Sequence, residues 1–301
     1  IIMRKILNTS LLFAFIFLIG CKDKKQQVTV KTLDAKSLMD ASSERLKKYW
    51  GMGDATAISE EFTAEATRVI SNPASPIEGK QKIKNAFTAT FSEGSELKGS
   101  NINITLLETR LVSEDILLGA GTFEIIDDNK NILESGKWGN VYKVWEGKIK
   151  FLLESAHLKI DPTKMVGKAP TALKNSIASE ALHFEKIQAS VSNYIKFANE
   201  GNADQLAMLF AEDGIQSVSS KEGVVMGREK IKATEAYAEG QVLNANILGY
   251  KYLGNSLAIG YGNWNQLDEK SNTMVFGQWG NLFKIEGDTA YLLMESAGRI
   301  E

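Results

Sequence analysis

The sequence predicts an α+β protein that contains two tandem copies of one domain. The first observation is an internal repeat, because residues 136–156 align without gaps on residues 277–297 and nine of the 21 positions are identical. Upstream, Phe62 matches Phe210 at a slightly larger offset. A period this long that occurs twice indicates two homologous domains rather than a solenoid of short repeats.

The second observation is the order of the elements, which is clearest in the second copy. Apolar residues recur at helical spacing from Phe184 to Ala198, and Gly201-Asn202 ends this helix. Helices followed by a run of antiparallel strands are typical of α+β domains. The other expected elements are, in chain order, a short helix at 206–210, a strand at 215–218, a helix from 228, and strands at 244–253, 257–266, 274–285 and 289–297.

The repeat and its flanks predict the domain organisation. We expect the first domain at 36–158 and the second at 177–301. Between them, residues 159–176 contain Pro162 and Pro170 together with several lysines, a composition that favours a linker.

The N-terminus has the features of an export signal. Residues 1–20 combine basic residues with the ten-residue apolar stretch 11–20, which is too short to span a bilayer. Cys21, the only cysteine, follows Leu-Ile-Gly, which resembles the lipobox of bacterial lipoproteins and implies a lipid on Cys21. Residues 21–35 would then be a tether. We expect a lipid-anchored protein of the cell envelope, at the outer membrane or cell surface; the alternative is a secretory signal with a chance cysteine.

Overall composition is that of a globular protein. Hydrophobic residues make up 44% and charged residues 24% of the chain, and the formal net charge is −2. A nucleic-acid partner would require a basic surface, and no such charge pattern is present.

Both copies carry motifs that resemble the nuclear transport factor 2-like superfamily, specifically its SnoaL-like branch. The motifs are G-(N/D)-x-x-x-(L/I)-x-x-x-F, G-(K/R)-x-x-I-K, and strands containing G-x-W-G-N and E-S-A. The resemblance implies a curved antiparallel sheet wrapped around N-terminal helices, which forms a cone with a pocket at its wide end. Members commonly dimerise sheet to sheet, so the two copies are expected to form an intrachain pseudo-dimer.

The resemblance also implies which side chains enzymes of this superfamily would use, and several are missing. His157 and His183 do not occupy matching positions, and we interpret both as boundary or surface residues. The steroid-isomerase branch keeps its base carboxylate in a strand that here reads Arg68–Ser71 or Gln216–Ser219, without an acid. Neither a histidine-based site nor isomerase-type proton abstraction at this position is therefore expected.

Strand alternation selects the candidate pocket residues. Trp138, Asn140 and Tyr142 fall on one face of a strand, and Trp279 and Asn281 match the first two. Rings and an amide on one face suit a flat or apolar ligand. The alternative is that the tryptophans are core residues and the asparagines satisfy neighbouring backbone groups.

Glu154 and Glu295 are acids on apolar strand faces, which is costly unless they are paired or face a cavity. Each is a candidate pocket acid with a raised pKa, or the partner of Lys143 or Lys284 on the adjacent strand. We favour the structural ion pair because the same residues recur in both copies.

The second domain is the better candidate for a ligand pocket, because its central strand adds Tyr261 and Asn263, and the first domain is interpreted mainly as a scaffold. No metal-ligand spacing, nucleophile motif or phosphate loop is present, so no metal or cofactor is expected. The predicted ligand-binding residues are Trp279, Asn281, Tyr261, Asn263, Glu295, Trp138, Asn140, Tyr142 and Glu154.

From these observations we predict an anchored, non-catalytic protein that binds a small apolar or aromatic ligand. The first alternative is a SnoaL-like isomerase, dehydratase or hydrolase, with Glu295 as base and Tyr261 or Asn281 as polariser. The second alternative is a protein–protein interaction module whose cones are filled by side chains.

Overall fold

A computed structural model describes residues 34–159, 181–235, 240–268 and 273–300. The predicted signal peptide, the predicted lipidation site Cys21, nearly all of the tether and most of the linker at 159–176 lie outside these ranges. Residues Leu33–Glu301 form one compact unit. No described helix is long and apolar enough to cross a membrane.

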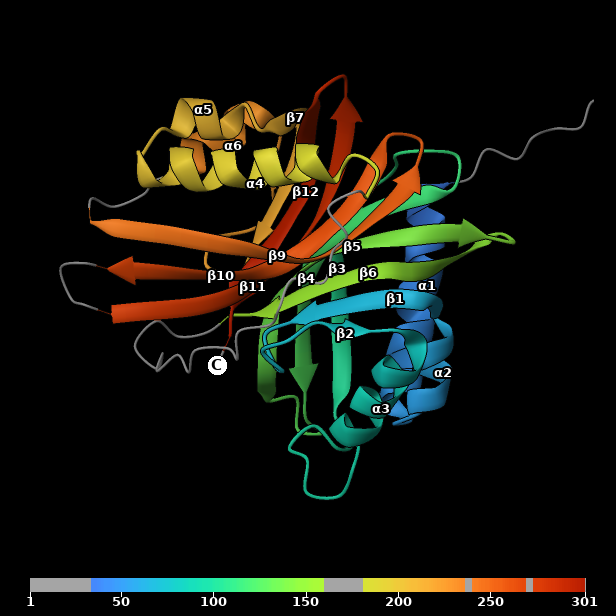
Figure 1. Cartoon of the computed structure of the whole chain (residues 1–301). Helices are drawn as coiled ribbons and strands as arrows, with labels where there is room; N and C mark the ends of the chain where they lie inside the picture. The colour runs from blue at the N-terminus through green and yellow to red at the C-terminus, as the bar shows by residue number, and fades with distance from the viewer. Residues whose placement is uncertain (1–33, 160–180, 236–239, 269–272, 301) are drawn as a thin grey trace, which may run out of the picture. The chain divides into compact units, whose positions relative to one another are not determined.

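Within the described residues, each repeat has three helices and one six-stranded sheet (Figure 1). The first sheet has the order β2-β1-β6-β5-β4-β3 and the second the order β8-β7-β12-β11-β10-β9. The elements of the first repeat are α1 (Ala35–Gly51), α2 (Ala55–Glu60), β1 (Phe62–Ile70), β2 (Ile77–Glu78), α3 (Lys80–Thr90), β3 (Asn101–Leu111), β4 (Ile116–Ile126), β5 (Ile132–Trp145) and β6 (Lys148–Leu158). Those of the second are α4 (Phe184–Asn199), α5 (Ala203–Ala207), β7 (Phe210–Val218), β8 (Val225–Met226), α6 (Arg228–Thr234), β9 (Gln241–Gly254), β10 (Leu257–Asp268), β11 (Thr273–Glu286) and β12 (Thr289–Arg299).

The α+β class with two copies of a sheet-and-helix domain is confirmed, with two differences in detail. The sheets are mixed rather than antiparallel, because β1 pairs in parallel with β6 and β7 pairs in parallel with β12. The short helix expected at 206–210 ends at Ala207, and Phe210 already begins β7.

Local chemistry explains where the helices begin. Asp34, Asp54 and Asn202 accept hydrogen bonds from the first backbone N–H groups of α1, α2 and α5. The helices α3 and α6 instead follow Gly79 and Gly227, whose φ angles of 87° and 88° favour glycine.

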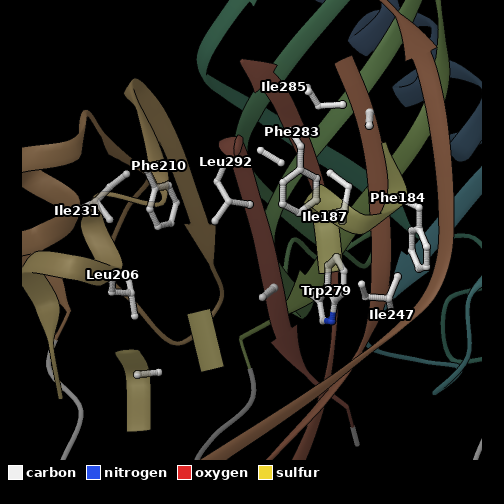
Figure 2. Close-up of a cluster of buried hydrophobic side chains, with 14 of the residues drawn as sticks. Phe184, Ile187, Leu206, Phe210, Ile231, Ile247, Trp279, Phe283, Ile285 and Leu292 are labelled. Carbon is white, nitrogen blue, oxygen red and sulfur yellow. The ribbon is translucent and has the colours of Figure 1, made fainter. Parts of the chain in front are cut away.

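The concave face of each sheet packs against its own helices. In the first repeat, Phe62 of β1 stacks on Phe151 of β6 with ring centres 4.6 Å apart, and Phe87 of α3 packs against Phe62. The second repeat has the equivalent core, in which residues of α4, α5 and α6 meet Phe210, Trp279, Phe283 and Leu292 of the sheet (Figure 2).

The opposite faces of the two sheets pack on each other. Val141 and Leu153 of the first repeat share one buried cluster with Leu282 and Met294 of the second. Ser296 Oγ donates to the carbonyl of Ser155 at 3.0 Å, and Ser155 Oγ donates back to the carbonyl of Ser296 at 3.4 Å. In these two bonds, the hydroxyl group of each serine donates to the backbone carbonyl of the matching serine in the other repeat.

Glycine permits this close approach. A Cβ atom at Gly139 would lie 2.9 Å from Cβ of Ser296, and one at Gly280 would lie 3.0 Å from Oγ of Ser155. Both glycines belong to the repeated W-G-N segment. Glu65 and Asp213, which flank the same faces, pair with basic residues of the opposite repeat.

The surface assignment of His157 is wrong. Its side chain is fully buried where the sheets meet, Nε2 lies 2.9 Å from Ser155 Oγ, and Nδ1 has no hydrogen-bond partner among the described residues. Burial lowers the pKa of His157 to about 3. His183 is half-buried, with a φ of 62°, at the start of α4.

We expect the pH dependence of stability to report His157. The unfolded chain binds a proton on this imidazole at about pH 6.5, whereas the folded chain does not until about pH 3. The contribution of His157 to the free energy of unfolding should therefore fall by about 1.4 kcal/mol per pH unit as the pH drops below about 6. Urea unfolding between pH 7.5 and 5 measures this slope.

The His157→Gln variant should have a shallower slope over the same pH range, because the glutamine does not titrate. His183→Gln is the matched control, since it removes an imidazole from the half-buried start of α4. An unchanged slope in His157→Gln would show that other groups control acid stability.

Candidate functional site

The first repeat contains a cavity of about 480 Å³ between its helices and the concave face of its sheet. Aromatic and aliphatic side chains from both layers form most of its wall. Four of the predicted ligand-binding residues line it, namely Trp138, Asn140, Tyr142 and Glu154. The first repeat, interpreted from its sequence mainly as a scaffold, therefore also contains a cavity.

A buried ion pair contributes to the wall of this first cavity. Arg68 of β1 donates through Nε and Nη2 to the two carboxylate oxygens of Glu154, with Nη2 at 3.2 Å. The guanidinium carbon also lies 4.1 Å from the ring centre of Phe87. Lys143, the expected partner of Glu154, pairs with Asp115 instead, because it lies on the other face of β5.

Asn140 has a structural role in this wall. Its Oδ1 accepts from the backbone N–H of Ser155 at 2.9 Å, and its Nδ2 donates to Tyr142 Oη at 3.1 Å. Burial raises the pKa of the Tyr142 phenol, so the hydroxyl stays protonated at neutral pH. The indole N–H of Trp138 donates to the carbonyl of Thr122.

The second repeat contains a cavity of about 300 Å³ in the equivalent place. Trp279, Asn281 and Glu295 line it. Asn281 Oδ1 accepts from the backbone N–H of Ser296 at 3.1 Å, which repeats the bond made by Asn140. Phe283 replaces Tyr142, so the phenol oxygen that accepts from Asn140 in the first repeat has no counterpart here.

Tyr261 and Asn263 do not line the second cavity, which corrects their assignment. Tyr261 belongs to the cluster where the two sheets meet, and its hydroxyl donates to Glu78 of the first repeat at 2.6 Å. Asn263, two residues further on the same face of β10, accepts from Asn246 at 3.1 Å. The residue between Asn263 and Asn265, Trp264, points into the cavity.

Glu295 lies in a hydrogen-bonded acidic cluster. Gln216 Nε2 donates to Glu295 at 2.7 Å and to Glu235 at 2.6 Å. Lys221 donates to Glu235 at 2.5 Å and to Gln216 Oε1 at 2.8 Å. Lys284, the expected partner of Glu295, pairs with Glu286 instead.

This environment raises the pKa of the Glu295 carboxyl group. Burial is the main cause that raises its pKa, and the charge of Glu235 adds to it. Lys221 and hydrogen bonds from Gln216 and Tyr194 oppose the shift without cancelling it. A carboxyl group with a raised pKa can donate or accept a proton near neutral pH.

The two cavities differ through coordinated replacements at matching positions. Relative to the first repeat, β7 has Gln216 in place of Arg68, Glu235 directly after α6 stands in place of Phe87, and Lys221 replaces Pro73. The local groups sum to zero charge for Arg68 and Glu154. They sum to −1 for Lys221, Glu235 and Glu295 when both acids are ionised, and the charge of Glu235 is, after burial, the second cause of the raised pKa of Glu295.

Five residues of these sites escaped the sequence interpretation: Arg68, Tyr194, Gln216, Lys221 and Glu235. Arg68 and Gln216 were recognised only as positions that lack an acid. The sequence did contain a signal for them, because the two copies carry different residue types at these positions. The differing positions include β1 and β7, the strands that pair with those of Glu154 and Glu295. Within the described residues, no group of three or more His, Cys, Asp or Glu side chains could hold a metal ion.

No protein-family model matches the sequence, and no curated protein matches it. Among solved structures, the chain is similar to a domain of unknown function with a cystatin-like fold from Nostoc punctiforme, with 12% identity and a TM-score of 0.38, over 43% of this chain and 80% of the other. An NTF-2 like protein of unknown function from Shewanella oneidensis has 17% identity and a TM-score of 0.34, over 39% and 99%. A ketosteroid isomerase-like protein from Erwinia carotovora atroseptica has 11% identity and a TM-score of 0.35, over 40% and 98%.

Glu154 and Glu295, which occupy matching positions, should respond differently when each is replaced by glutamine. Glu154→Gln leaves the buried Arg68 without its counter-charge, so we expect a loss of about 3 kcal/mol in the free energy of unfolding. Glu295→Gln replaces an acid whose ionised form is disfavoured, so we expect a change within about 1 kcal/mol at pH 7.5.

Urea unfolding of both variants across pH 5 to 8.5 tests this contrast. The folded chain binds the Glu295 proton more tightly than the unfolded chain, so the contribution of Glu295 to wild-type stability should fall as the pH rises above about 4.5. The benefit of Glu295→Gln should therefore grow with pH. Equal losses in the two variants would contradict the different environments of the two acids.

Proposed function

We propose that this protein binds a small apolar or aromatic molecule in the cavity of the first repeat, and that a lipid on Cys21 anchors it in the bacterial envelope. The cavity carries the first part of this proposal. Its volume of about 480 Å³ lies in the range of small-molecule sites, and its walls are mainly aromatic and aliphatic. The anchoring rests on the sequence preceding Cys21.

The polar groups of the first cavity suit a neutral ligand. Arg68 and Glu154 neutralise each other, and Asn140 and Tyr142 are hydrogen-bonded to each other. An ionised ligand group would have to compete with these partners in a buried site. Burial of apolar surface therefore supplies most of the expected affinity.

Matched cavity-filling variants test this binding. Ala156 lines the first cavity and Ala297, at the equivalent position, lines the second. The uncharged fluorescent probe N-phenyl-1-naphthylamine should show blue-shifted fluorescence when it binds the wild-type protein. We expect Ala156→Phe to lower the affinity for this probe at least tenfold. The Ala297→Phe variant should retain most of the wild-type affinity for the probe. Thermal unfolding of both variants controls for overpacking.

Probe binding that survives Ala156→Phe unchanged would contradict the first cavity as the site. Equal losses in two variants that unfold at the wild-type temperature would place binding at a surface common to both repeats. Either result would overturn this proposal.

A second candidate function is acid–base catalysis in the second cavity, which the raised pKa of Glu295 favours because it makes the carboxylate a stronger base. In this reaction the Glu295 carboxylate would remove a proton from a carbon next to a ketone, and the C–H electron pair would form an enolate. The same proton would return to the γ carbon, which moves the double bond. Asn281 lines the same cavity and supplies an amide donor for the oxygen.

Conversion of 3-cyclohexen-1-one to 2-cyclohexen-1-one, followed by ultraviolet absorbance, measures this activity. We expect Glu295→Gln to lower the rate at least 100-fold, because the positioned base is lost. Lys284→Gln, on the other face of the sheet, is the control. A wild-type rate equal to that of buffer, or full activity in Glu295→Gln, would exclude this function for the probe reaction.

A further inference from the structure

Lys137 of the first repeat reaches into the second repeat. It lies on β5, its side chain is almost fully buried, and its ammonium group donates to the backbone carbonyls of Val218, Lys221 and Gly223. The distances to Val218 and Gly223 are 3.0 and 2.5 Å. Three acceptors match the three N–H bonds of an ammonium group, which compensates for its burial.

The same segment forms part of the second cavity. The backbone carbonyl of Lys221 accepts from Lys137, while the side chain of Lys221 donates to Glu235 and Gln216. A contact from the first repeat thus holds the backbone of the residue that brings a cation to the acidic cluster. Next to Lys137, the carbonyl of Trp138 accepts from Ser217 Oγ at 3.0 Å and fixes the adjoining end of β7.

The reciprocal contact exists but lacks the charge. Gln278, which matches Lys137, donates through Nε2 to the carbonyls of Ile70 and Pro73 at 2.7 and 2.9 Å. Ile70 and Pro73 line the first cavity. Each repeat therefore holds a wall segment of the other's cavity, but the segment held by Gln278 carries Pro73 where the other carries Lys221.

We propose that Lys137 is a positioning residue for the second cavity: by holding segment Val218–Gly223, it places Lys221 against Glu235 and so tunes the proton affinity of Glu295. This inference rests on the proposed acid–base role of the second cavity. Without Lys137, the segment is free to carry Lys221 away, and the acidic cluster loses the cation that pairs with Glu235. An intrachain pair of repeats is then needed for a complete second site.

The direction of the effect follows from the groups that face Glu295. Glu235 and burial raise its pKa, whereas Lys221, Gln216 and Tyr194 lower it, and Arg299 also lines the cavity. Displacement of Lys221 removes a lowering influence. Glu295 should then hold its proton to a higher pH.

The test is a carbon-13 NMR titration of the Glu295 carboxyl in the purified full chain, assigned by its absence in Glu295→Gln. We expect Lys137→Gln, which copies the residue at position 278, to raise the titration midpoint by at least one pH unit. Lys221→Met should give the same shift, and the double variant should add nothing. Gln278→Ala, which loosens the other segment, should leave the midpoint unchanged.

An unchanged midpoint in Lys137→Gln, or an equal shift in Gln278→Ala, would overturn the inference. If Lys137→Gln does not fold, Lys137→Arg provides the test, because a planar guanidinium cannot direct three bonds from one nitrogen and should shift the midpoint in the same direction. The titration needs no substrate. A shifted midpoint in a protein without isomerisation of 3-cyclohexen-1-one would therefore support the role of Lys137 while rejecting the acid–base function.

Discussion

The close contact between the two sheets is the constraint on which the rest of this structure depends. Gly139 and Gly280 let the opposite strands approach until Ser155 and Ser296 exchange hydrogen bonds with each other's backbone. A Cβ atom at Gly139 would lie 2.9 Å from Cβ of Ser296 and one at Gly280 would lie 3.0 Å from Oγ of Ser155, so a larger residue at either position would require these close neighbours to shift. The repeated segments W-G-N and E-S-A therefore combine interface residues with residues that face the cavities.

This contact ties the cavity walls of each repeat to the other repeat. The chain at the end of β1 and the segment after β7 lie within hydrogen-bond distance of the opposite sheet. Gln278 donates to the first of these segments and Lys137 to the second. The buried His157 belongs to the same region. Changes at the interface are thus expected to reach the cavities through backbone position, without any direct contact with a ligand.

The two copies use one scaffold for different electrostatics. In the first repeat, Arg68 supplies a cation from the adjacent strand, and its ion pair with Glu154 neutralises both charges. In the second repeat the cation comes from Lys221 on a connecting segment, and a second acid, Glu235, joins the cluster. Burial and the charge of Glu235 together raise the pKa of Glu295, because ionisation of two neighbouring buried acids is costly at low dielectric.

Sequence reasoning was most successful where the repeat itself carried information. Identity between residues 136–156 and 277–297 predicted two equivalent strand pairs, and the shared motif G-(K/R)-x-x-I-K begins at Gly79 and Gly227, directly before α3 and α6. Alternation placed Trp138, Asn140 and Glu154 beside one cavity, and Trp279, Asn281 and Glu295 beside the other. It failed for Tyr261, because its face of β10 is covered by the other repeat rather than by a cavity.

What the sequence alone determined is the α+β class, the duplication and the strand faces, because these follow from local periodicity and from matches along the chain. Only the tertiary structure decided the partners of the buried charges. Arg68 and Glu154 are far apart in sequence and meet through a parallel strand pair that no local pattern reveals. Lys137 and Val218–Gly223 meet only because two separate sheets pack face to face, and this packing depends on surface complementarity rather than on sequence spacing.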